Sequence, residues 1–96
     1  MATEDLTEAT TFCSYHQVEY TFVQSLADAG LLEITVINQT NYIPQHQLAE
    51  LERMVRLHQD LEINVAGIEA IIHLLQRLHN TQQELQILKN RLRIYE

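Results

Sequence analysis

The sequence predicts a mainly α-helical domain with one short β-hairpin and a long C-terminal helix that pairs with another helix. Three observations support this prediction. The 96 residues are 46% hydrophobic but include only two Gly and one Pro, which fits one small helix-rich unit. A β-branched segment follows position 33, as expected of short strands. From residue 68 onward, apolar residues follow an unbroken heptad pattern.

Two short helices are predicted near the amino terminus. In the first helix, Thr7 is the expected N-cap and Glu8 lies in the first turn. The apolar residues that share one face of this helix are Leu6, Ala9, Phe12 and Cys13. The second is predicted over residues 19–29 and ends at Gly30, which suits a left-handed C-cap. Its apolar positions are Val18, Phe22, Val23 and Leu26. Two helices joined by a tight turn predict a helix-turn-helix.

A hairpin and a third helix follow in the sequence. Residues 34–37 and 42–43 are rich in β-branched and aromatic side chains and flank a polar turn at 38–41, which predicts a wing. Pro44 has a φ preset for a first helical turn, so a third helix should begin near it. Its predicted apolar stripe is Leu48, Leu51, Met54, Val55 and Leu61, widened by Leu57. Asn64 is then the expected N-cap of the last helix.

The C-terminal helix carries more apolar surface than its own domain can cover. Its heptad seam consists of Ile71, Leu74, Leu78, Thr81, Leu85, Leu88, Leu92 and Tyr95. Residues nearest the domain should pack back onto it, namely Ile68, Ile71, Ile72 and Leu75. Beyond Leu78 the helix outruns the domain, so we expect a homodimer. The chain then divides into a winged helix-turn-helix domain, 1–67, and a dimerisation helix, 68–96, within a single structural unit. The expected interface residues are Ile71, Leu74, Leu78, Leu85, Leu88 and Leu92.

The charges are distributed unevenly along the chain. All six Lys and Arg lie after position 52, whereas eight Asp and Glu lie at or before it. The first 52 residues therefore carry −8 and the remainder +1, which together give the net charge of −7. The electrostatic field of such a negatively charged segment attracts and orients positively charged partners.

The same charges argue against DNA as the ligand. The second helix is expected to present Tyr20, Thr21, Gln24 and Asp28 outward, without a cation to displace counterions from phosphates. The nearest cations, Arg53 and Arg56, have carboxylates three or four residues away, at Glu50, Glu52 and Asp60. The only basic cluster, Lys89, Arg91 and Arg93, compensates the dipole at the end of the last helix.

Metal and catalytic sites are not predicted. Three His/Glu pairs are four residues apart, but no third ligand is placed near any of them; they are His46 with Glu50, His58 with Glu62, and Glu69 with His73. The lone Cys13 has the pattern of a small buried residue. There is no Gly-rich phosphate loop and no nucleophile motif, so we expect no enzyme, no metal and no cofactor. A single cysteine and an acidic amino terminus without a signal pattern lead us to expect a cytoplasmic protein without a membrane partner.

The order of these parts resembles the MerR-type winged helix fold: helix-turn-helix, "AGLLE", wing, central helix and long terminal coil. In detail the chain is similar to the CbpM family of chaperone modulators over about residues 10–93. The matching segments are "FC" at 12–13, "GLLE" at 30–33, "RMVRLHQDL" at 53–61, "GI" at 67–68 and "LKNRL" at 88–92.

The resemblance implies a binding protein without catalytic activity. CbpM-type proteins bind the J-domain of a CbpA-type, DnaJ-like co-chaperone, whose surface is basic, and block its stimulation of a DnaK-type chaperone. It also implies an antiparallel pairing of the terminal helices. Because Glu33, Glu50 and Asp60 lie in or beside the matching segments, we expect them to contact the J-domain. The alternative is a MerR-like transcriptional regulator that binds operator DNA as a dimer.

Overall fold

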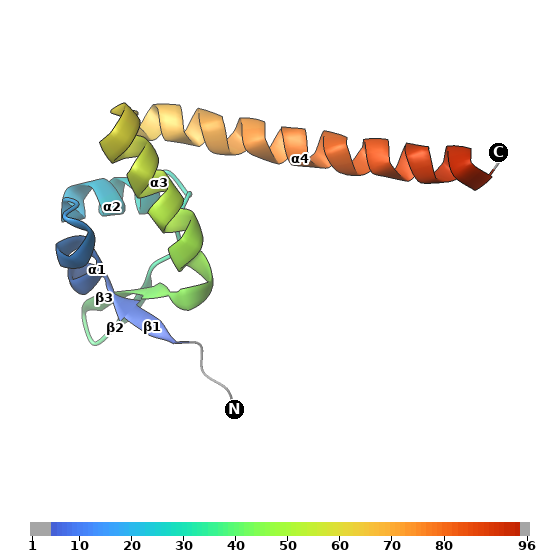
Figure 1. Ribbon diagram of the computed structural model, residues 1–96. Helices are drawn as coiled ribbons and strands as arrows, with labels where there is room; N and C mark the ends of the chain where they lie inside the picture. The colour runs from blue at the N-terminus through green and yellow to red at the C-terminus, as the bar shows by residue number, and fades with distance from the viewer. Residues whose placement is uncertain (1–4, 95–96) are drawn as a thin grey trace.

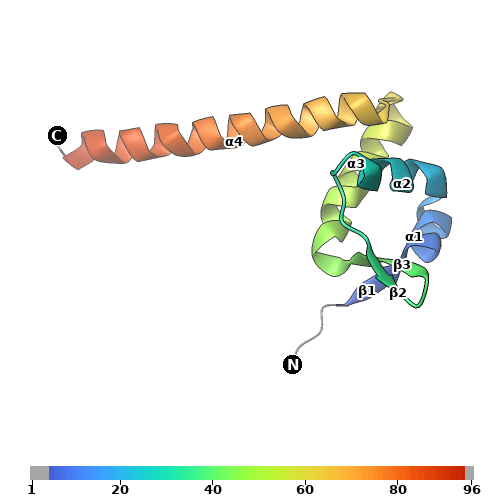
Figure 2. The ribbon, with the colours of Figure 1, turned by 180° about the vertical axis from the view of Figure 1, so that it is seen from behind.

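The computed structural model describes residues 5–94 and has the predicted fold. A winged helix-turn-helix domain lies at one end, and the last helix extends far beyond it in both views (Figures 1 and 2). The elements in chain order are β1 (Leu6–Glu8), α1 (Ala9–His16), α2 (Tyr20–Asp28), β2 (Thr35–Ile37), β3 (Thr40–Pro44), a 3-10 helix η1 (Gln45–Gln47), α3 (Leu48–Leu61) and α4 (Val65–Ile94). The radius of gyration, 17.6 Å, exceeds the roughly 12–13 Å expected of a compact chain of this length, because α4 projects.

The predicted wing is present and belongs to a larger sheet. Strands β2 and β3 form an antiparallel hairpin, closed by Asn38 and Gln39 with φ values of 50° and 64°. Two consecutive left-handed residues give the turn a twist that matches its strands. The third strand, β1, pairs antiparallel with the other edge of β3. It was not predicted from the sequence, since three residues are too few to show an alternating pattern.

Strand β1 also corrects the predicted start of α1. Thr7 is not the N-cap, because pairing with Ile43 holds it in extended backbone. The helix begins at Ala9, and Glu8 occupies the N-cap position with φ −62° and ψ 131°, without a side-chain capping bond. The sequence predicts Glu8 in the first turn of this helix, but Glu8 precedes that turn.

The turns around α2 follow the prediction closely. The helix spans Tyr20–Asp28, and Gly30 has a φ of 79°. The N–H of Gly30 bonds the Ala27 carbonyl, and that of Leu31 bonds the Leu26 carbonyl, each at 3.0 Å. These two bonds form a Schellman motif, in which the glycine supplies the left-handed residue.

Helix α3 begins slightly later than predicted. Pro44 is the last residue of β3, paired with Leu6, and its ψ of 142° is extended rather than helical. A helical turn, η1, starts directly after it, and α3 begins at Leu48. Leu61 does not belong to the buried stripe. It is 65% exposed, because it is the last residue of α3 and the chain reverses at Glu62, whose φ is 55°.

One hydrophobic core joins the sheet, α1, α2, α3 and the start of α4. Its buried apolar residues are Ala9, Phe12, Cys13, Val18, Phe22, Val23, Leu26, Leu32, Ile43, Leu51, Met54, Val55 and Ile68. The predicted core positions of α2 and the central positions of α3 are among them. No polar or charged residue of the range 5–94 is buried.

Helix α4 is seated in the domain only by its first turns. Asn64 caps it as predicted, since its Oδ1 accepts a 2.8 Å bond from the N–H of Gly67. Ile68 is fully buried and Ile72 packs against the core, whereas Leu75 is 40% exposed and so packs back less than predicted. Every residue from 73 to 94 is exposed. Tyr95, the last seam residue, lies outside the described residues. Within them, no helix is both long and apolar enough to span a membrane.

Candidate functional site

The outward face of α2 is polar and carries carboxylates near both helix ends. Thr21 Oγ1 donates to Glu19 Oε2 at 3.4 Å, and Gln24 Nε2 donates to Asp28 Oδ1 at 3.1 Å. In a helix-turn-helix reader these outward groups would meet base edges and phosphates. Here they bond one another, beside negative charge that repels a phosphate.

Tyr20 does not face outward as predicted. It is half-buried and packs against the core, and its hydroxyl accepts a hydrogen bond from Asn41 Nδ2 of β3. The sequence pattern could not show this contact, because the two residues are 21 positions apart. Tyr20 therefore links α2 to β3 of the wing.

The wing also lacks cations. At its free edge strand, β2, Val36 and Ile37 are exposed, and the tip is the polar pair Asn38 and Gln39. No Lys or Arg occurs before position 53. The helix-turn-helix and its wing together present no positive side chain of their own.

The two nearest cations lie on α3, and one of them is paired locally. Arg53 Nη1 lies 3.8 Å from Glu50 Oε2, as the spacing predicts. Glu52, expected beside Arg56, instead has its Oε1 3.8 Å from His16 Nε2 of α1. All these side chains are about a quarter to a half exposed, where such pairs contribute little to stability. Their effect is on the local charge.

The three predicted partner-binding acids lie at different points along η1 and α3. The side chain of Gln47 accepts a 2.7 Å bond from the Glu33 N–H and donates a 3.2 Å bond to the Glu33 carbonyl. Glu33 is thereby held beside η1, directly before α3, and Glu50 lies in the first turn of α3. Asp60 is exposed and lies ten residues further along α3, about 15 Å away. The three acids therefore extend along α3 rather than forming one cluster.

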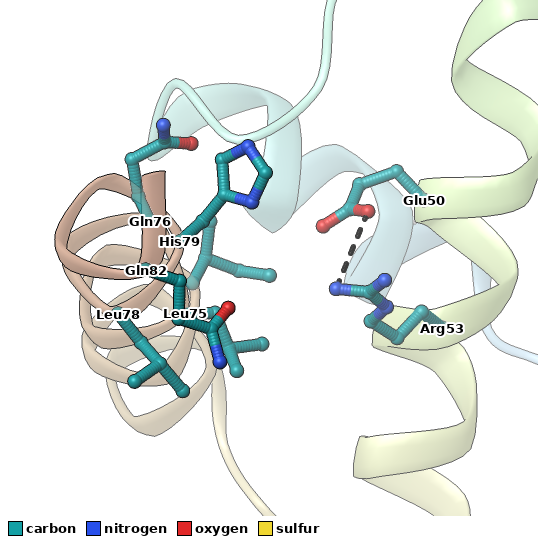
Figure 3. Close-up of a pocket in the computed structure, with 8 residues that line it drawn as sticks. Glu50, Arg53, Leu75, Gln76, Leu78, His79 and Gln82 are labelled. Atoms are coloured by element: carbon teal, nitrogen blue, oxygen red, sulfur yellow. Dashed lines mark ion pairs between the residues drawn. The ribbon is translucent and has the colours of Figure 1, made fainter. Parts of the chain in front are cut away.

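A cavity of about 420 Å³ lies where α3 and α4 diverge. Figure 3 shows the Glu50–Arg53 pair of α3 on one side and side chains of α4, including Leu75 and Leu78, on the other. One wall is thus ionic and the other partly apolar. Leu78 belongs to both this cavity and the heptad seam.

The predicted seam is exposed along most of α4. Ile71 is half-buried, and the other five predicted interface residues are each more than half exposed: Leu74, Leu78, Leu85, Leu88 and Leu92. Such a continuous apolar stripe is unusual on a monomer and indicates an interaction surface. Charged Arg77 and Glu84 flank it on one side.

Two of the candidate metal residues, His58 and Cys13, have other surroundings. The His58 ring stacks on Phe22 with centroids 4.0 Å apart, and its Nδ1 lies 3.0 Å from the Ile63 carbonyl. Cys13 is buried, and this burial raises the pKa of its thiol. No three His, Cys, Asp or Glu side chains between residues 5 and 94 gather to hold a metal ion.

Comparison with known proteins identifies the family from the whole arrangement. No curated protein matches the chain significantly. The model of the MerR HTH family regulatory proteins matches residues 7–90, which covers the helix-turn-helix, the wing, α3 and most of α4. The chain therefore belongs to the MerR family of helix-turn-helix regulatory proteins.

Proposed function

We propose that this chain is a protein-binding member of its family that acts as a chaperone modulator. It occupies the J-domain of a CbpA- or DnaJ-like co-chaperone and inhibits the action of that co-chaperone on a DnaK-type chaperone, without catalysing a reaction. The observation that carries this proposal is the absence of Lys and Arg from the first 52 residues, which form the helix-turn-helix, the wing and the start of α3.

The electrostatic argument has two parts. Non-specific attraction to duplex DNA comes mainly from Lys and Arg that displace counterions, and the outward face of α2 offers carboxylates instead. A surface with a charge of −8 attracts a basic protein surface and raises its rate of association. Glu33, Glu50 and Asp60 contribute to this attraction as the proposed J-domain contacts. The similarity of "GLLE" and "RMVRLHQDL" to CbpM-type segments supports the choice of partner.

A second candidate is a MerR-like regulator that binds operator DNA. The family match favours it, because it describes helix-turn-helix regulatory proteins. In that case Arg53 and Arg56 would have to supply most of the phosphate contacts of each domain, and Arg53 already lies beside Glu50.

Both candidates act as a homodimer through α4 in this proposal. An antiparallel pair can place Ile71 across from the partner's Leu88, Leu74 across from the partner's Leu85, and Leu78 across from the partner's Thr81. Arg77 then flanks the partner's Glu84, twice per dimer. A shift by one heptad brings Arg77 beside the partner's Arg91 and Glu84 beside its own counterpart, so charge selects the first register.

Two binding measurements on the purified chain test the proposal. Calorimetric titration with the isolated J-domain of a CbpA-like protein should give binding that weakens as salt is added. A gel shift with duplex DNA at low salt should show no retardation. Sequence-selective DNA retention together with no heat from the J-domain would establish the regulator instead.

A further inference from the structure

A groove between α1 and α3 is separate from the cavity between α3 and α4. It has a volume of about 210 Å³, below the roughly 300–1,000 Å³ of typical small-molecule sites. Its main walls are Phe12, Tyr15 and His16 of α1 and Leu48 and Glu52 of α3. No residue of α2, β2 or β3 lines it. The groove therefore has the size for a protein side chain and is built from elements other than α2 and the wing.

The aromatic wall of the groove is held in place before any ligand binds. The rings of Phe12 and His16 have centroids 4.2 Å apart, and Tyr15 meets His16 edge-on at 5.0 Å. Phe12 is buried, whereas Tyr15 is 83% exposed. A large aromatic side chain exposed beside a preformed groove has the properties of an interface hot spot.

The charge of the groove specifies the ligand. Glu52 is the acid that lines it, and its carboxylate lies 3.8 Å from His16 Nε2. A carboxylate next to aromatic faces suits a cation on an aliphatic stem, because the stem packs on the rings and the cation meets both the π face and the carboxylate. Lys and Arg are the protein side chains with this chemistry.

We propose that this groove is the anchor site for a Lys or Arg side chain from the basic surface of the partner protein. This assignment rests on the proposed function and locates its central contact at Tyr15 and Glu52. Glu50 lies two residues from Glu52, about 200° around α3. The predicted acids Glu33, Glu50 and Asp60 do not line the groove, so they supply long-range attraction while the groove supplies the close contact.

The test is calorimetry of the full chain with the isolated J-domain. Tyr15→Ala should raise the Kd about tenfold or more, and Glu52→Gln should raise it about fivefold. Tyr15→Phe should bind within about twofold of the unmodified chain, because the ring is retained. Glu19→Gln removes the same charge from an exposed position outside the groove and should also change the Kd by less than about twofold. Circular dichroism and the melting temperature should stay unchanged in all four variants, since Tyr15 and Glu52 are not buried.

The outcomes separate this assignment from the proposed function. If the unmodified chain binds the J-domain but Tyr15→Ala and Glu52→Gln bind equally well, the groove is not the anchor and the proposed function stands. If Glu19→Gln weakens binding as much as Glu52→Gln, a diffuse acidic field rather than a groove holds the partner. If the unmodified chain does not bind the J-domain, the proposed function is wrong and the anchor site is withdrawn with it.

Discussion

Gln24 Nε2 donates a 3.1 Å hydrogen bond to Asp28 Oδ1, one turn away on the outward face of α2. In a DNA-reading helix this amide would be available to a base edge. Here it is bonded to a carboxylate that itself repels the phosphate backbone. The fold of a DNA reader is thus retained while the outward chemistry of α2 opposes nucleic acid.

Adding cations to α2 should create DNA affinity, which we expect the unmodified chain not to have. We expect the double variant Thr21→Lys with Asp28→Lys to retard duplex DNA at low salt, because both positions are exposed. Each new phosphate contact should steepen the salt dependence of binding by about 0.9 in log–log slope. The matched control, Thr21→Gln with Asp28→Asn, should not bind. Retardation of DNA by the unmodified chain under the same conditions would contradict the electrostatic argument.

Reversing the three predicted partner-binding acids should weaken capture of the J-domain. Glu33→Lys, Glu50→Lys and Asp60→Lys together change the net charge of the chain by about +6, so the association rate should fall by about tenfold or more at low salt. Stopped-flow mixing with a labelled J-domain measures this rate. Unchanged association in the triple variant would remove these residues from the interface, although the partner could still be correct.

A charged residue in the middle of the α4 seam should abolish the dimer. Leu85 is about half exposed in the single chain and would be covered by the partner's Leu74 in the pair. Leu85→Arg places a charge there without a counter-ion, and burying an unpaired charge is strongly unfavourable. Analytical ultracentrifugation should show a monomer. Because Gln83 is exposed and off the seam, Gln83→Arg is the control that should stay dimeric; a dimer of Leu85→Arg would refute the seam.

The register of the pair can be tested by exchanging two charges. Arg77→Glu alone places two carboxylates side by side, and Glu84→Arg alone places two cations side by side, so each should weaken the dimer. The effect should be about 0.5–1 kcal/mol for each of the two pairs. The double variant restores opposite charges and should recover most of the dimer affinity. Equal loss in the single and double variants would mean that Arg77 and Glu84 do not meet.

Local signals in the sequence predicted some of the helix ends but not the N-cap of α1, where Thr7 lies in β1. Gly30 and Asn64 were placed correctly, because a left-handed φ and a side-chain cap depend on residues within about one helical turn. Contacts between distant segments were missed. Strand β1 exists because β3 offers a free edge to it, and Tyr20 turns inward because Asn41 is there. Neither cause is visible in the few residues around the feature itself.

The same distinction applies to the candidate site. The exposed seam followed from a heptad pattern along a single helix. The groove at Tyr15 and Glu52 forms only because α1 and α3 meet, although 36 residues separate these two positions. A repeating pattern within one helix cannot predict such a contact between two helices. The spacing of charges along α3 instead predicted Glu52 as a partner of Arg56, whereas the structure places Glu52 beside His16.

Cys13 should resist modification in the folded chain. It is only 7% exposed, and burial raises the pKa of its thiol, so at neutral pH less thiolate is present than in the unfolded chain, where the pKa is unperturbed. Since the thiolate is the reacting species, a disulfide reagent should react slowly with the native chain and rapidly in denaturant. As this is the only cysteine, one equivalent of reagent reports unfolding of the core around α1.

The rate of the native reaction should depend on pH. It should keep rising with pH beyond the ordinary pKa of a thiol, because burial raises the pKa of Cys13 and the thiolate forms only at higher pH. Equal rates in the native and denatured chain would show that α1 opens readily, and the preformed wall of the groove, which depends on Phe12 beside Cys13, would then lack its support.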